Sequence, residues 1–287
     1  MSKKINIVYF TGTGGTERAA KCFEAELSEK GYEVELMRLK GDAYFGYDGK
    51  APLMLLYPVY EMNAPAHVYG WLNSIGSVEN IPAFVISVSG GGETSPNTAC
   101  RTKAIKILES KGYTVSYEEM LTMPANVFIH LKPELSKMLL DVLPIKVKRF
   151  VADIDSGKTL RKKPGALDKM FTRLGTRTEN GVKEIGQQFT ISESCIGCGW
   201  CAEHCPTGNI TIADKKPIFS DKCNFCLSCI YGCPKKAIST KKGSFAVIKQ
   251  GYDLREIEKL PTIENANIDA LTKGWLYSGM RKYLKDV

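Results

Sequence analysis

The chain has 287 residues, of which 44% are hydrophobic and 24% charged, and its formal net charge at pH 7 is +8. This length and hydrophobic content predict two globular domains and exclude a disordered or fibrous chain. Most of the positive excess falls in residues 145–187 and after residue 240. We therefore attribute the charge to a solvated connector and tail, and expect no nucleic-acid binding.

The sequence contains no segment suited to a lipid bilayer. No run of 18 apolar residues occurs, and Met1-Ser2-Lys3-Lys4 leads directly into an apolar stretch without a signal-peptide core or cleavage site. We expect a cytoplasmic protein that does not span a membrane.

Residues 1–155 are expected to form a first domain in which strands and helices alternate. Apolar, β-rich runs predict strands at 5–10, 33–39, 53–57, 83–89 and 113–120. Helices are expected at 17–30, 66–75, 97–111 and 133–155. Alternation of this kind predicts an α/β domain with a parallel, doubly wound sheet and helices on both faces.

The turn after the first strand is rich in small and hydroxyl residues: Thr11, Gly12, Thr13, Gly14, Gly15 and Thr16. Glycines allow the backbone to form a nest of N–H groups, and the following helix adds positive potential at its N-terminus. The three threonine hydroxyls can donate further hydrogen bonds. The turn lacks the Gly-Lys-Ser/Thr of a P-loop and the dinucleotide G-x-G-x-x-G. It therefore predicts a different kind of phosphate site.

This Thr-Gly-Thr-Gly-Gly-Thr turn resembles the FMN-phosphate loop of flavodoxins. The resemblance implies a five-stranded sheet of order 2-1-3-4-5 with FMN at the carboxyl ends of the strands. It also implies that the loops after the third and fourth strands flank the flavin ring. The residues implied there are Pro58, Val59, Tyr60 and Asn63, and Ser89, Gly90, Gly91 and Gly92.

Tyr60 is the candidate to cover one face of the ring, although an ordinary packed loop tyrosine fits the sequence equally well. Many flavodoxins supply an aromatic residue from each loop, whereas the second loop here has none. One face or edge of the ring is therefore expected to be open to another part of the chain, a partner or a substrate.

Residues 156–187 are expected to be a connector, because glycine, proline and charged residues dominate them. One short helix is predicted at 166–173. The bases Lys158, Arg161, Lys162 and Lys163 fit a solvated face better than a surface that steers an acidic redox partner.

Eight of the ten cysteines form two matched runs, each of the form C-x2-C-x2-C-x3-C-P, offset by 28 residues. This is the ligand pattern of two 4Fe–4S clusters, in which the fourth cysteine of each run binds the other cluster. Structural zinc needs two pairs per ion, and disulfides need an oxidising compartment, so both fit less well. The predicted ligand sets are Cys195, Cys198, Cys201 and Cys233 for one cluster, and Cys223, Cys226, Cys229 and Cys205 for the other.

From Phe189 to Ile238 the chain resembles bacterial two-cluster ferredoxins, which implies a small α+β domain over residues 188–240. Folding and cluster binding are expected to be coupled there. Residues 241–287 are expected to form a tail with helical content around 268–284, and this tail is expected to dock the two domains together.

Together these features resemble a flavodoxin–ferredoxin fusion, an arrangement seen in proteins of anaerobic bacteria and archaea. It implies an electron carrier with FMN and two 4Fe–4S clusters that converts one- and two-electron steps. Its partners would be redox proteins such as ferredoxin-linked oxidoreductases, and it could form a homodimer. The alternative is an FMN-dependent reductase of a small acceptor fed by the clusters. The sequence contains no recognisable set of acid–base or nucleophilic catalytic residues.

Overall fold

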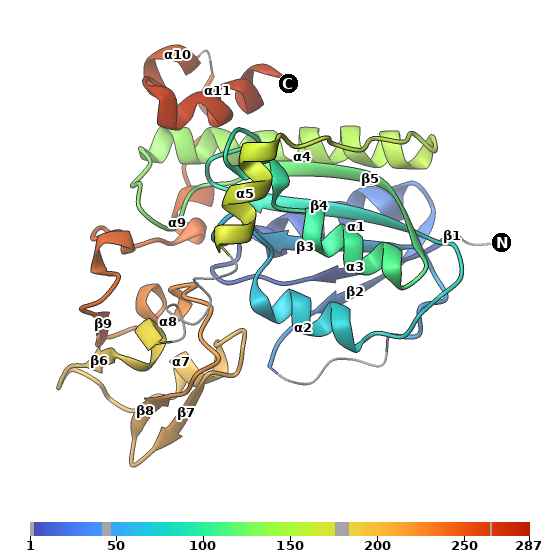
Figure 1. Ribbon diagram of the computed structural model, residues 1–287. Coiled ribbons are helices and arrows are strands. Elements are labelled where there is room, and N and C mark those ends of the chain that lie inside the picture. The colour runs from blue at the N-terminus through green and yellow to red at the C-terminus, as the bar shows by residue number, and fades with distance from the viewer. Residues whose placement is uncertain (1–2, 42–46, 176–183, 265) are drawn as a thin grey trace.

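The computed structural model describes residues 3–41, 47–175, 184–264 and 266–287 (Figure 1). Its main sheet has five parallel strands in the order β2-β1-β3-β4-β5. The strands are β1 (Lys3–Tyr9), β2 (Tyr32–Arg38), β3 (Leu53–Pro58), β4 (Ile81–Ser89) and β5 (Tyr113–Thr122). This order is that of the flavodoxin-like doubly wound fold and confirms the predicted fold class.

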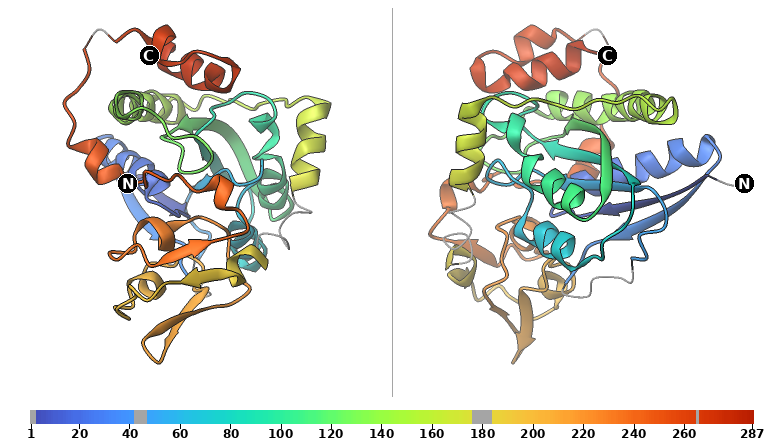
Figure 2. Two further views of the ribbon diagram at one scale, coloured as in Figure 1. Left: turned by 90° about the vertical axis from the view of Figure 1, so that its left-hand side faces the viewer. Right: turned by 45° about the vertical axis from the view of Figure 1, so that its right-hand side comes forward.

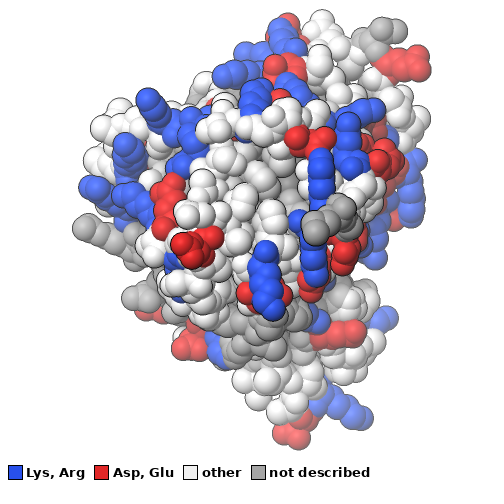
Figure 3. All heavy atoms as spheres, turned by 90° about the vertical axis from the view of Figure 1, so that its right-hand side faces the viewer, with Lys and Arg blue, Asp and Glu red and all other residues white. Residues whose placement is uncertain are grey.

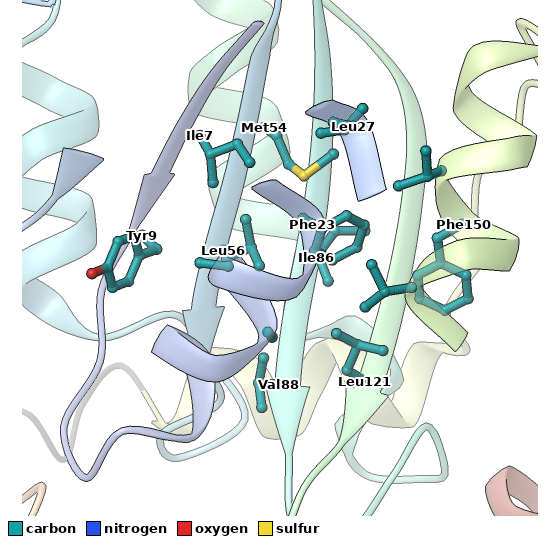
Figure 4. Close-up of a cluster of buried hydrophobic side chains, with 14 of the residues drawn as sticks. Ile7, Tyr9, Phe23, Leu27, Met54, Leu56, Ile86, Val88, Leu121 and Phe150 are labelled. Atoms are coloured by element: carbon teal, nitrogen blue, oxygen red, sulfur yellow. The ribbon is translucent and has the colours of Figure 1, made fainter. Parts of the chain in front are cut away.

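Helices cover both faces of the sheet, as the alternating pattern predicted. The helices are α1 (Gly15–Glu29), α2 (Ala66–Ser74), α3 (Thr102–Ser110) and α4 (Pro133–Asp155). Apolar side chains of α1 and α4, such as Phe23 and Phe150, pack on one face (Figure 4). Side chains of α2 and α3, such as Trp71 and Leu108, pack on the other. Each face of the sheet therefore has its own apolar core, and these cores fix where the strands end and where their loops meet.

The helix expected at 97–111 is interrupted near its start. A short 3-10 turn, η1 (Asn97–Ala99), precedes α3, and Arg101 lies between them. The side chain of Arg101 is fully buried, with its Nε 2.9 Å from an oxygen of Glu118 and its Nη1 2.8 Å from Ser87 Oγ. A buried guanidinium needs such partners, and the break in the helix allows Arg101 to reach them.

The connector is attached to the first domain along much of its described length. Leu160 pairs with β5, through its N–H to Ser116 and its carbonyl to the N–H of Glu118. Three of the four connector bases bond within the chain, Lys158 to Asp153, Arg161 to Glu118 and Glu109, and Lys162 to Glu119. The predicted short helix is α5 (Ala166–Gly175). The remainder of the expected connector includes residues 176–183, which lie outside the described residues.

The second domain is built from short elements. Strand β6 (Phe189–Ile191) pairs antiparallel with β9 (Ile238–Thr240), and β7 (Ile210–Ala213) with β8 (Lys216–Phe219). Two single-turn helices, α7 (Trp200–Glu203) and α8 (Ser228–Tyr231), occupy equivalent places in the two cysteine runs. Cysteines make up much of the small core of this domain.

The tail is broken into η2 (Ser244–Ala246), α9 (Leu254–Glu258), α10 (Ile268–Leu271), η3 (Trp275–Tyr277) and α11 (Ser278–Lys285). The helical content expected around 268–284 is divided between α10 and α11, with a break at Gly274, whose φ of 94° no helix permits. The last part of the tail lies over α4 (Figure 2), where Met280 and Leu284 join Leu135 and Leu139 in a small apolar cluster.

Lysine and arginine side chains are interspersed with acidic ones on the face at the amino ends of the strands (Figure 3). No helix among the described residues is long and apolar enough to cross a membrane.

Candidate functional site

A cavity of about 540 Å³ lies at the carboxyl ends of the main sheet, where flavodoxin-like folds bind ligands. The loops after β1, β3, β4 and β5 line it, together with parts of the second domain and of the tail. Twelve of the fourteen residues predicted to bind the cofactor line this cavity: Thr11, Gly12, Thr13, Gly15, Thr16, Pro58, Val59, Tyr60, Asn63, Ser89, Gly90 and Gly91.

The phosphate loop has the backbone shape that its glycines suggested. Gly14 adopts a φ of 92° as the residue before α1, and its N–H donates to the Thr11 hydroxyl at 3.1 Å. Gly14 itself does not line the cavity, so its role is conformational. The first N–H groups of α1 have no partner within the helix and face the same end of the sheet. This arrangement fits a bound phosphate.

The Thr13 side chain interacts with neighbouring residues, so it is not available to a phosphate alone. Its Oγ1 accepts a hydrogen bond of 3.1 Å from the Asn126 side chain, and Tyr252 of the tail lies beside it. Burial raises the pKa of Tyr252, so this phenol remains protonated at neutral pH. The phosphate loop is therefore connected to the loop after β5 and to the tail.

The loop after β3 is closed by Tyr60 and Asn63, whose backbone groups exchange hydrogen bonds of 2.9 and 2.8 Å. The Asn63 side chain donates to the carbonyl of Thr172 in α5 at 2.8 Å. Its amide therefore fixes α5 against the loop. Burial raises the pKa of Tyr60, and Cys226, Tyr252 and Cys223 nearby raise it further.

The loop after β4 is held by Ser89, whose Oγ accepts from the Gly91 N–H at 3.1 Å and from the Asn97 side chain at 2.8 Å. A Cβ added at Gly90 would lie 2.6 Å from that of Ala125, so only glycine fits this approach. Gly92 does not line the cavity; it packs against Gly279 of the tail, which an added Cβ would meet at 2.8 Å.

Three segments contribute to the cavity in ways the sequence did not reveal: the loop after β5, residues 123–129; the end of α5; and the tail around residues 275–280. Helix α5 bridges the two ring loops: Asp168 accepts hydrogen bonds from Ser95 at 2.6 Å and from Thr98, after β4, and the Thr172 carbonyl accepts from Asn63, after β3. Burial alone would raise the pKa of Asp168, but these bonds outweigh it and hold the pKa below its usual value. None of the three segments carries a recognisable motif.

The first predicted cluster-ligand set is brought together by the fold. A small separate cavity of about 20 Å³ is lined by all four of its members, Cys195, Cys198, Cys201 and Cys233. Burial raises the pKa of Cys201, and the nearby Cys233 and Cys195 raise it further. The fourth cysteine of the second run thus lies beside the first three of the first run.

The second predicted set is also assembled, deeper in the molecule. Burial, together with Cys223 and Cys205, raises the pKa of Cys226 to about 12. Burial and the neighbouring Cys226, Cys223 and Cys205 raise the pKa of Cys229 well above its usual value. Buried thiols that raise one another's pKa ionise readily only beside positive charge, which iron supplies. This donor set therefore fits a cluster bound by thiolates.

Backbone N–H groups point at three of these sulfurs: Asn209 to Cys205, Phe225 to Cys223 and Ala237 to Cys233, each at 3.3 Å. Hydrogen bonds to sulfur are one of the ways a protein tunes cluster potentials. Among the residues that the structure describes, no three His, Cys, Asp or Glu side chains converge as around a single metal ion.

The second cysteine set adjoins the large cavity. A Cβ added at Gly12 would lie 2.6 Å from the Cβ of Cys226 and 2.5 Å from the Tyr60 hydroxyl. Asn126 bridges the same junction, since its side chain donates to the carbonyl of Cys226 at 3.2 Å as well as to Thr13. Tyr231 donates to the carbonyl of Asn126 at 2.8 Å. The phosphate loop and the second cysteine run are therefore in direct contact.

Residues 194–237 match the family model of the 4Fe-4S dicluster domain. No curated protein matches the chain. Solved structures with a similar shape include flavodoxins from Megasphaera elsdenii (20% identity, 50% of this chain and 98% of that chain, TM-score 0.34) and Pseudomonas aeruginosa (12%, 53% and 97%, 0.41). Another is general stress protein 14 from Treponema denticola, in complex with FMN (10%, 53% and 98%, 0.40). Because these TM-scores are low, the fold assignment rests on strand order.

The chain therefore joins a flavodoxin-like domain to a 4Fe–4S dicluster domain.

Proposed function

We propose that the large cavity binds FMN, with its phosphate in the loop Thr11–Thr16 at the N-terminus of α1 and its ring between the loops after β3 and β4. The polar end at α1 suits a phosphate, and the glycines of both loops allow the backbone to approach a flat ring. Tyr60 lines this cavity, which supports its proposed contact with the ring.

We further propose two 4Fe–4S clusters with the ligand sets given above, and electron transfer between them and the flavin within one chain. Each cluster carries one electron at a time, whereas a flavin holds one or two. The observation that carries this proposal is the close approach of both Cys226 and Tyr60 to Gly12 of the phosphate loop. It makes the cluster held by Cys205, Cys223, Cys226 and Cys229 the one next to the flavin.

The residues at this junction would hold the two cofactors in fixed positions and keep water out. Asn126 ties Thr13 to the backbone of Cys226, and the Tyr252 hydroxyl donates to the carbonyl of Pro124 at 3.0 Å. These bonds connect both domains and the tail, so the distance between the cofactors does not depend on a flexible linker.

The other cluster would face the partner. Cys198 is exposed, and the adjacent Ile196 is 59% exposed. We propose that single electrons are exchanged here with redox proteins such as ferredoxin-linked oxidoreductases. Electrons would then pass through the inner cluster to the flavin.

Cofactor analysis and rapid kinetics of anaerobically purified protein test this proposal. We expect about eight irons and one FMN per chain, from two four-iron clusters and one flavin. In Cys226→Ser, flavin should be retained while cluster-to-flavin transfer slows at least tenfold. The control is Cys22→Ala, a cysteine packed against the core of the first domain. Equal transfer rates in Cys226→Ser and Cys22→Ala would contradict the proposal.

A second candidate is a flavin-dependent reductase of a small acceptor. It is favoured by the extent of the cavity, which continues past the ring loops to Phe128 and Trp275. Saturable oxidation of the reduced protein by a small molecule would support it.

A further inference from the structure

The large cavity has an apolar open end that the proposed flavin site does not use. Phe128, Trp275 and Leu276 line the cavity, yet they are 67%, 78% and 47% exposed. Phe245, 78% exposed, stacks on Phe128 with ring centroids 5.9 Å apart. We call these four residues the aromatic rim. Exposed apolar groups clustered at a cavity mouth mark ligand or partner sites.

The backbone holds the rim in place. Phe128 has a φ of 63°, a left-handed conformation that is strained for a bulky residue, and its N–H donates to the Ala246 carbonyl at 3.0 Å. Such strain concentrates at ligand sites. The tail that carries Trp275 is anchored just beyond it, where a Cβ added at Gly279 would lie 2.1 Å from the Gly91 carbonyl oxygen. The hydrogen bond at Phe128 and the close packing at Gly279 therefore hold the segments that carry the rim in place.

The chemistry of the lining selects the kind of ligand. Among the described residues that line the cavity, Glu61 is the one charged side chain, and it belongs to the loop after β3. The rim comes instead from the loop after β5 and from the tail. No lysine or arginine is among the described residues that line the cavity. A carboxylate or phosphate group at the rim would therefore lose its hydration without compensation. Aromatic faces favour a flat, neutral ring that can stack.

We propose that the aromatic rim binds a neutral, planar aromatic molecule of the quinone class. Because the rim residues Phe128, Trp275 and Leu276 line the same cavity as Gly90 and Gly91 of the ring loop, such a ligand would share the cavity with the flavin ring. Reduction of this ligand rests on the proposed function, because it requires FMN in the cavity and electrons from the clusters. The quinone gains two electrons and two protons and leaves as the hydroquinone, while the reduced flavin loses the same electrons and protons. The clusters re-reduce the flavin with electrons from a protein donor.

Calorimetric titration of the anaerobic holoprotein with duroquinone tests the binding step. Duroquinone is fully substituted and does not alkylate cysteines. We expect saturable binding to the wild-type protein, and affinity about fivefold lower in Trp275→Ala and in Phe128→Ala, because each loses a stacking partner. Phe171→Ala is the matched control, since this half-exposed aromatic residue of α5 does not line the cavity.

Flavin and iron contents are measured on the same samples, which separates the two proposals. If protein that contains no flavin still binds duroquinone at the rim, the proposed FMN function is contradicted and the quinone site is not. Flavin-loaded protein that does not bind duroquinone, or binds it equally in all three variants, overturns the quinone site. The quinone site is also overturned if light scattering shows that Trp275→Ala dissociates a dimer while the affinity for duroquinone stays unchanged. The rim would then be an interface between two copies of the chain.

Discussion

The two domains owe their structures to different interactions. The flavodoxin-like domain has apolar cores on both sides of a five-stranded sheet, with fully buried residues such as Phe23, Leu56 and Trp71. The dicluster domain has strands of three or four residues and a core in which Cys201, Cys205 and Cys229 are principal members. Small domains with so little apolar burial usually depend on metals or disulfides. Hydrophobic burial therefore holds the first domain together, and we expect the proposed clusters to hold the second.

Removing iron should produce the largest difference between the domains. We expect anaerobic chelation to unfold residues 189–240, because cluster binding supplies much of their folding free energy. The first domain should remain folded. Hydrogen exchange followed by mass spectrometry measures both in one sample, with untreated protein as the control. Full amide protection of β6 and β9 after iron loss would contradict the comparison.

A substitution in the apolar core of the first domain should destabilise that domain and leave the dicluster domain unaffected. Phe150 is 1% exposed and packs edge-on against Tyr117, with ring centroids 6.0 Å apart. Phe150→Ala should lower the free energy of unfolding of this domain by about 3–5 kcal/mol. Chemical denaturation measures it.

The matched control is Lys148→Ala, an exposed position on the same helix, which should change stability by no more than about 0.5 kcal/mol. The visible absorbance of the clusters should be the same in both variants. Loss of that absorbance in Phe150→Ala alone would show that the domains are not independently stabilised.

Gly12→Ala tests the junction where the domains meet. The new Cβ would lie within 2.6 Å of both Tyr60 and Cys226, so one of them must move, at a cost of about 1–3 kcal/mol. We expect weaker FMN binding together with an altered EPR spectrum of the inner cluster. In the control Gly76→Ala, the added Cβ meets nothing within 4 Å, and this position does not line the cavity. Similar changes in both variants would contradict a specific contact at Gly12.

The smallest expected effect concerns Arg18 of α1 and Glu258 of α9, whose side chains form an ion pair. Because Glu258 is 44% exposed, Glu258→Gln should cost at most about 1 kcal/mol. The hydrogen bond from Arg18 lowers the pKa of Glu258, so this stabilisation is present at neutral pH and is lost as the pH falls through the folded-state pKa. Thermal unfolding at pH 7 and pH 3 measures it. A larger destabilisation at pH 3 than at pH 7 would contradict this sign.

Sequence alone predicted what is set by local patterns. Apolar, β-rich runs predicted the five strands, and the resemblance of the Gly/Thr turn to flavodoxins implied their order. The repeated cysteine spacing indicated the 4Fe–4S domain that residues 194–237 match. The Gly/Thr turn pointed to a ligand loop that does line the large cavity. Each of these signals lies within a few residues of the chain.

Contacts between distant segments were not predictable in the same way. Asn126 meets both Thr13 and Cys226, and Asp168 meets Ser95, but no spacing rule relates such residues. The tail was expected to have helical content around 268–284, but the break at Gly274 and the place of the next residue, Trp275, in the cavity lining were not foreseen. Tertiary packing decides these positions.

The most direct test of the central claim is a rapid anaerobic reduction experiment that follows flavin absorbance and cluster EPR together. The protein receives less than the roughly four electrons that one FMN and two clusters can hold. If the clusters and the flavin form one relay, electrons will redistribute among them at a rate independent of protein concentration. A rate that rises in proportion to protein concentration, or a flavin that stays oxidised beside reduced clusters, would contradict transfer within one chain.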